Sequence, residues 1–95
     1  MNELFREYED TAEMLKALAH PVRLCIVKGL IHQGKSNVSY IQDCLTLPQS
    51  TVSQHLQKLR SAEIVEADRN GLEVRYSIRN DKVKQLIEII FKGEA

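Results

Sequence analysis

Uncharged polar side chains cluster in residues 49–58, and they are suited to recognising the edges of DNA bases. Gln, Ser and Thr side chains both donate and accept hydrogen bonds, whereas an ordinary solvated helix face carries mostly Lys and Glu. The side chains that we expect on this face or at its borders are Gln49, Ser50, Thr51, Ser53, Gln54, His55 and Lys58. The glutamines and serines among them would read base edges, and Thr51 and Lys58 would position phosphates. A plain polar surface helix is the alternative for this segment taken alone.

The elements that position this face are two helices joined by a short turn. Val52, Leu56 and Leu59 are four and three residues apart, the spacing of the buried side of a helix. A shorter helix is predicted at 39–45, followed by a tight turn at 46–48. Together these segments predict a helix-turn-helix, whose second helix would enter the major groove of DNA.

A two-stranded hairpin is predicted directly after the second helix. Residues 64–68 and 72–78 alternate apolar and polar side chains, as half-buried strands do. Between them, Asn70-Gly71 is a strong signal for a tight hairpin turn. A hairpin in this position forms the wing of a winged helix, with Arg69 and Arg75 as candidate DNA contacts. A solvated hairpin without DNA contacts is the alternative interpretation.

Three further helices complete the predicted fold, at residues 3–18, from Pro21 to about Ile31, and at 83–91 after an Asn80-Asp81 cap. The fold class is therefore mainly α with a β-hairpin, in the order ααααββα, as a single winged-helix domain over residues 1–95. The first and last helices carry more apolar surface than a chain this short can cover, which predicts a homodimer. The residues expected at its interface are Leu4, Phe5, Tyr8, Leu86, Ile90 and Phe91.

Composition limits the possible partners. The 95-residue chain is 43% hydrophobic and has a formal net charge of zero, so one copy should bind DNA only modestly and two copies would be needed. No apolar run approaches the roughly 20 residues that span a membrane. The acidic N-terminal stretch lacks the apolar core of a secretory signal, so we expect a cytoplasmic protein without a membrane partner.

Three blocks of sequence resemble the ArsR/SmtB family of bacterial winged-helix repressors. They are LKALAHPVRL at 15–24 with Ile26 and Val27, QSTVSQHL at 49–56, and GLEVRY at 71–76. The resemblance implies a dimer built from the first and last helices and a recognition helix that starts at Gln49. It also implies repression through an imperfect palindrome in a promoter.

Many members of this family sense metals, but the matching ligand positions are changed here. Asn37 and Ser39 stand where one metal motif has cysteines, and Asn80 and Lys82 stand where the other has Asp and His. Soft metals require thiolate or imidazole ligands, so we expect no metal and no cofactor. The chain is thus more similar to the PagR-like members, which lack the metal sites, and its effector is unknown.

Two alternative functions stay open. Cys25 and Cys44 could form a thiol switch, although the paired cysteines of redox-sensing relatives link the second helix to the last one. We expect Cys44 to pack against the recognition helix as a small apolar residue. The other alternative is a winged-helix protein-interaction module, which would dock through the wide apolar surface of residues 83–91. Enzymatic activity is not expected, because the sequence has no phosphate-binding glycine loop, nucleophile elbow or paired catalytic acids.

Overall fold

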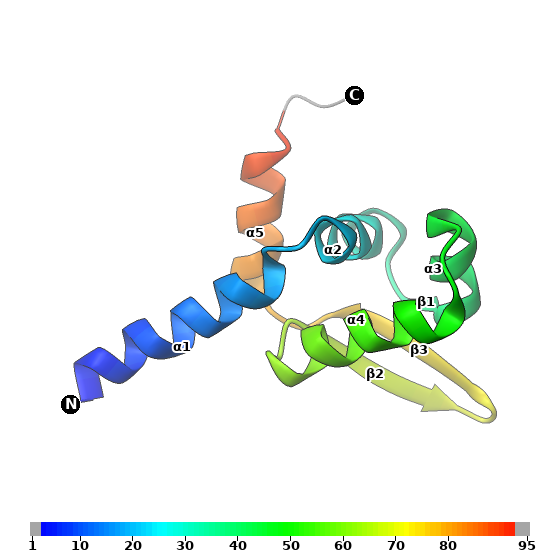
Figure 1. The fold of residues 1–95 in the computed structure, drawn as a ribbon, viewed down its shortest axis with the longest axis horizontal. Helices are drawn as coiled ribbons and strands as arrows, with labels where there is room; N and C mark the ends of the chain where they lie inside the picture. The colour runs from blue at the N-terminus through cyan, green and yellow to red at the C-terminus, as the bar shows by residue number, and fades with distance from the viewer. Residues whose placement is uncertain (1–2, 93–95) are drawn as a thin grey trace.

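The computed structural model describes residues 3–92, and its helices and hairpin follow the predicted order. The helices are α1 (Glu3–Leu18), α2 (Pro21–Gln33), α3 (Val38–Leu45), α4 (Gln49–Ser61) and α5 (Asp81–Ile90), and the strands are β1 (Ser36–Asn37), β2 (Val65–Asn70) and β3 (Glu73–Ile78). Figure 1 shows α3 and α4 joined by a short turn, with the β2–β3 hairpin beside α4. The predicted winged helix-turn-helix is confirmed.

The hairpin turn lies one residue later than the sequence predicted. Asn70 still pairs with Glu73 across the two strands, so Gly71 and Leu72 form the turn. Gly71 has a φ of 68°, a conformation that glycine adopts without a steric cost. The Asn-Gly signal therefore located the hairpin correctly but assigned Asn70 to the turn instead of to β2.

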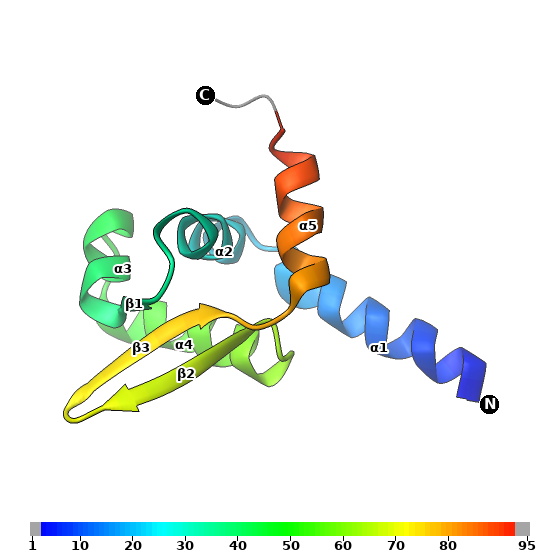
Figure 2. The same cartoon turned by 180° about the vertical axis from the view of Figure 1, so that it is seen from behind.

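The sheet has a third strand that the sequence did not predict. The strand order is β1-β3-β2, and Ser36 and Asn37 of β1 pair with Tyr76 and Arg75 of β3. Two residues are too few to show the alternation from which strands are predicted. Figure 2 shows that this strand brings the connection between α2 and α3 against the wing.

One apolar core holds the helices on the sheet. Its buried residues are Leu18, Ile26, Val27, Leu30, Ile41, Val52, Leu56, Leu59, Ile64, Val65, Val83 and Ile87. The predicted stripe of α4 is fully buried, with Val52, Leu56 and Leu59 all 0% exposed. The orientation of α4 is therefore fixed, and its polar side faces outward. Within residues 3–92 no helix combines the length and apolar character needed to cross a bilayer.

Helices α1 and α5 leave apolar side chains uncovered. Helix α1 contributes only Leu18 to the core, and Figure 1 shows it extending away from the other elements. Leu4 and Tyr8 are 70% and 72% exposed, and Ile90 of α5 is 59% exposed. Leu86 and Phe91 of the predicted interface set instead pack partly against the core of their own chain.

Candidate nucleic-acid interface

Capping interactions set the geometry of the helix-turn-helix. The side-chain oxygen of Asn37 accepts a hydrogen bond from the Tyr40 amide at 2.8 Å and starts α3. Thr46 ends α3 in a left-handed conformation, with φ 55° and ψ 39°. Pro48 precedes α4 and provides no side-chain cap. A helix N-terminus without a side-chain cap leaves backbone N–H groups that suit a phosphate.

The predicted reading face of α4 is exposed. Gln49, Ser50, Ser53, Gln54 and Lys58 all lie open to solvent and outside the buried stripe, whereas Thr51 is half-buried. No carboxylate lies on α4, so hydrogen-bonding groups can approach DNA from this face without repelling its phosphates. Their roles as base and phosphate contacts remain predictions.

His55 lies toward the start of α2 and not on the open face. Its Nδ1 accepts a hydrogen bond from Nε of Arg23 at 3.2 Å, and its ring centroid is 4.5 Å from that of His20. Burial lowers the pKa of His55, and the neighbouring His20 and Arg23 lower it further. Because Nδ1 is already bonded, only Nε2 could reach DNA, and the predicted contact remains untested.

Arg23 and His20 connect three helices at this point. Arg23 also donates from Nη1 to the Ala17 carbonyl at the end of α1, at 3.3 Å. His20 accepts from the Val22 amide at 3.1 Å and caps α2. These contacts join the end of α1 and the start of α2 to α4. Sequence reasoning did not assign this role, although both residues lie in the LKALAHPVRL block.

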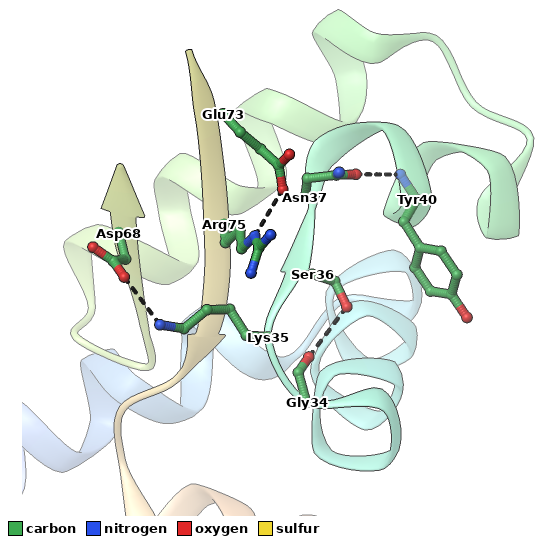
Figure 3. A network of polar contacts seen from close by, with 8 residues as sticks. All are labelled: Gly34, Lys35, Ser36, Asn37, Tyr40, Asp68, Glu73 and Arg75. Atoms are coloured by element: carbon green, nitrogen blue, oxygen red, sulfur yellow. Dashed lines mark hydrogen bonds and ion pairs between the residues drawn. The ribbon is translucent and has the colours of Figure 1, made fainter. Parts of the chain in front are cut away.

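The wing carries paired charges. Nε of Arg75 donates to Glu73 at 2.7 Å, and Nζ of Lys35 lies 3.0 Å from a carboxylate oxygen of Asp68 (Figure 3). Hydrogen bonds from Arg75 and Asn37 lower the pKa of the Glu73 carboxyl, and Glu73 raises the pKa of Arg75. A phosphate bound by Arg75 would therefore have to compete with Glu73. Sequence reasoning did not assign this pairing, although Glu73 lies two residues before Arg75 on the same face of one strand.

Arg69, the other predicted wing contact, is exposed on β2. It makes no ion pair with any side chain in the described part of the chain. Its guanidinium is thus available to a phosphate without displacing an acid.

Two of the four positions that correspond to family metal ligands, Asn37 and Asn80, serve as helix caps here. Besides Asn37, Asn80 accepts hydrogen bonds from the amides of Lys82 and Val83, at 2.9 and 3.2 Å. Across residues 3–92, no three His, Cys, Asp or Glu side chains come together as a possible metal site. The absence of metal sensing remains a prediction.

The prediction that Cys44 packs against the recognition helix is wrong. Both Cys25 and Cys44 are exposed, and both line one cavity between α2 and α3. Ile41 and Leu45, one helical turn apart, occupy the core-facing side of α3. Cys44 therefore lies at the edge of that side, where it faces α2.

Comparisons with known proteins agree with this architecture. A family model described as a helix-turn-helix domain matches residues 18–67. The transcriptional repressor PagR of Bacillus anthracis is 48% identical over 86 residues, which cover 90% of this chain and 86% of PagR. The crystal structure of PagR has a TM-score of 0.84 and covers 90% of this chain and 98% of that chain.

Two further relatives connect the chain to named families. The repressor SmtB of Mycobacterium tuberculosis is 40% identical over 83 residues, which are 86% of this chain and 61% of SmtB. The homodimeric winged-helix fragment of Mb0332 from Mycobacterium bovis, described as a possible ArsR-family regulator, is 31% identical, with a TM-score of 0.86 over 95% of this chain and 82% of that chain. The resemblance inferred from the three sequence blocks is confirmed. The chain belongs to the ArsR/SmtB family of winged helix-turn-helix transcriptional regulators.

Proposed function

We propose that this protein is a homodimeric transcriptional repressor that binds a two-fold operator through α4 and the β2–β3 wing. The observation that carries this proposal is the exposed, carboxylate-free polar face of α4. A protein-docking module has no need for such a face. PagR and SmtB are repressors by name, which supports the same function here.

Within this proposal each element has a separate task. The exposed glutamines and serines at the start of α4 read base edges in the major groove. Thr51, Lys58 and the uncapped N-terminus of α4 hold phosphates, and Arg69 and Arg75 hold the flanking backbone. Sequence specificity then comes from the polar side chains of α4, and general affinity for DNA comes from the Lys and Arg side chains.

A dimer is supported by the exposed apolar side chains of α1 and α5. Leu4, Tyr8 and Ile90 are each more than half exposed, and the Mb0332 fragment is a homodimer. A two-fold dimer of this kind would hold its recognition helices about one turn of DNA apart, roughly 34 Å. The operator would accordingly be a palindrome, and each half-site would contact one α4.

The test uses a duplex selected from a random library by the wild-type protein. Gln54→Ala should weaken binding to the selected duplex by about 1–3 kcal/mol and binding to random DNA by much less. Gln85→Ala makes the same change at an exposed position of α5 and should have no effect. Equal losses on both duplexes would show that Gln54 does not read bases. Failure to bind any duplex at low salt would favour the interaction-module alternative.

We also propose that repression requires neither a metal nor a cofactor. Asn37 and Asn80, at positions that correspond to family metal ligands, already use their side-chain oxygens as helix caps. Amide oxygens are weak ligands for zinc-class ions. Any control of DNA binding would then come from a different source.

A further inference from the structure

A cavity of about 200 Å³ lies between α2 and α3, outside the DNA-reading face. Its lining residues are Cys25, Ile26, Gly29, Leu30, His32, Gln33, Ser36, Tyr40, Ile41, Cys44 and Leu45. The buried members, Ile26, Leu30 and Ile41, form an apolar floor, and the exposed members form the rim. A cavity of roughly 150 Å³ lined by apolar side chains is large enough for benzene.

The chemistry of the lining favours an uncharged ligand. No Lys, Arg, Asp or Glu lines the cavity, so a charged molecule would lose its hydration without gaining an opposite charge. The polar side chains of the lining are those of His32, Gln33, Ser36 and Tyr40, together with the two cysteine thiols. A small apolar molecule with at most one or two polar atoms fits this combination.

Gly29 is an independent indication that the space is kept open. It lies inside α2, where glycine is less favourable than alanine by roughly 0.5–1 kcal/mol. The backbone does not require glycine there, since the glycines with positive φ are Gly34 and Gly71. Packing does not require it either, because a Cβ atom at Gly29 would meet no atom within 4 Å. Glycine at this position instead leaves one wall of the cavity without a side chain.

The cavity is connected to the DNA-binding elements through β1. Ser36 and Tyr40 line it, and Asn37 lies between them in the sequence. Asn37 caps α3 through the Tyr40 amide (Figure 3). In β1, Ser36 and Asn37 pair with Tyr76 and Arg75 of β3, the inner strand of the wing. A molecule that contacts Ser36 and Tyr40 therefore touches the segment that positions both α3 and the wing.

We propose that the cavity between α2 and α3 binds a small, uncharged, mainly apolar molecule of one or two rings, and that binding alters affinity for DNA. The effect of the ligand on DNA affinity rests on the proposed repressor function. The ligand acts only if it binds the DNA-competent arrangement of α2, α3 and β1 with a different affinity from the free arrangement. Repression would then respond to a small organic molecule.

The binding test uses toluene, p-cresol and indole as probes in amide NMR titrations of the full chain under reducing conditions. At least one probe should cause saturable shifts centred on residues 25–45, with a Kd below about 10 mM. Gly29→Leu places a side chain in the cavity and should weaken binding about tenfold or more. Gly29→Ala is the matched control, because one methyl group leaves most of the space open and the probe should still bind.

Either of two results would refute the proposal that the cavity binds a small molecule. One is the absence of saturable shifts with all three probes, and the other is equal binding by wild type and Gly29→Leu. The wild-type titration alone locates the bound probe, so the first result does not depend on how well either variant folds.

The coupling test measures fluorescence anisotropy of a selected duplex with and without saturating probe. The Kd for DNA should change about threefold or more for wild type and Gly29→Ala, and should stay constant for Gly29→Leu. Saturable probe binding with no change in the Kd for DNA would refute the regulatory part. If no duplex binds at all, the proposed repressor function fails, while the NMR titration still decides whether the cavity binds a ligand.

Discussion

Glu73 should limit the affinity of the wing for DNA, and Glu73→Gln tests this directly. The Glu73 carboxylate holds Nε of Arg75 at 2.7 Å, and the two side chains are 43% and 46% exposed. The substitution keeps the shape of the side chain and its ability to hydrogen bond, but removes its charge. Arg75 is then released from its ion pair and can contact a phosphate. Because exposed ion pairs contribute little to folding, the melting temperature should change very little.

The size of the effect follows from counterion release. Each additional phosphate neutralised on duplex DNA steepens the dependence of log K on log salt by about 0.9. A dimer has two wings, so the slope should steepen by about 1.8 in total. Between about 50 and 200 mM salt, a slope change of that size corresponds to roughly a tenfold change in relative affinity. The gain should be similar on selected and random duplexes, since phosphate contacts carry no sequence information.

Fluorescence anisotropy at several salt concentrations measures both the affinity and the slope. Glu88→Gln is the matched control, because it removes the same charge from α5, which lies away from the wing tip (Figure 1). The control should leave the slope unchanged. Weaker binding by Glu73→Gln would show that Glu73 positions Arg75 for DNA, and an unaltered slope would show that the released Arg75 gains no phosphate contact. Either result refutes competition by Glu73.

Three further predictions test assembly, signal and pH response. Ile90→Glu places a charge on the exposed apolar surface of α5. It should convert the dimer to a monomer in sedimentation equilibrium and should abolish operator binding. A wild-type monomer at micromolar concentration would contradict the proposed interface. Zinc, cadmium or arsenite at low micromolar levels should leave operator affinity unchanged under reducing conditions, and a loss of about tenfold with any of them would reveal a ligand set that includes a thiol. The pKa of His55 is lowered in the folded chain, whereas the imidazole of the unfolded chain has a pKa of about 6.5. The unfolded chain therefore binds a proton at a higher pH than the folded chain does. The free energy of unfolding should accordingly fall as pH drops from about 7 to 5. His55→Gln should flatten that dependence in urea denaturation, and an unaltered slope would exclude His55 as its source.

The sequence was sufficient to predict the orientation of the recognition helix. Because Val52, Leu56 and Leu59 repeat at helical spacing, they had to face the core together, and all three are fully buried. That constraint leaves Gln49, Ser53 and the other predicted reading residues on the open side. Local periodicity alone therefore predicts which side chains of α4 face outward.

Contacts between distant segments could not be predicted in this way. Arg23 bonds His55, which is 32 residues away, and β1 meets β3 through only two residues. Such pairs depend on how α2 packs against α4 and on how the α2–α3 connection reaches the sheet. The exposure of Cys44 has the same origin, because α3 turns Ile41 toward the core and leaves Cys44 facing α2. No residue pattern along one element encodes these choices.

The arrangement of charge explains how a chain with zero net charge can still select a DNA sequence. Lys35 and Arg75, the cations beside and on the wing, are each paired with an acid, Asp68 and Glu73. These acids reduce the attraction to any phosphate, and phosphate attraction is the main source of nonspecific binding. The α4 face has no acid, and in the proposed complex it would recognise the operator through hydrogen bonds that only suitable bases satisfy. Weak general attraction combined with a reading face that has no carboxylate would raise the ratio of specific to nonspecific affinity, and that ratio determines which sites in a genome are occupied.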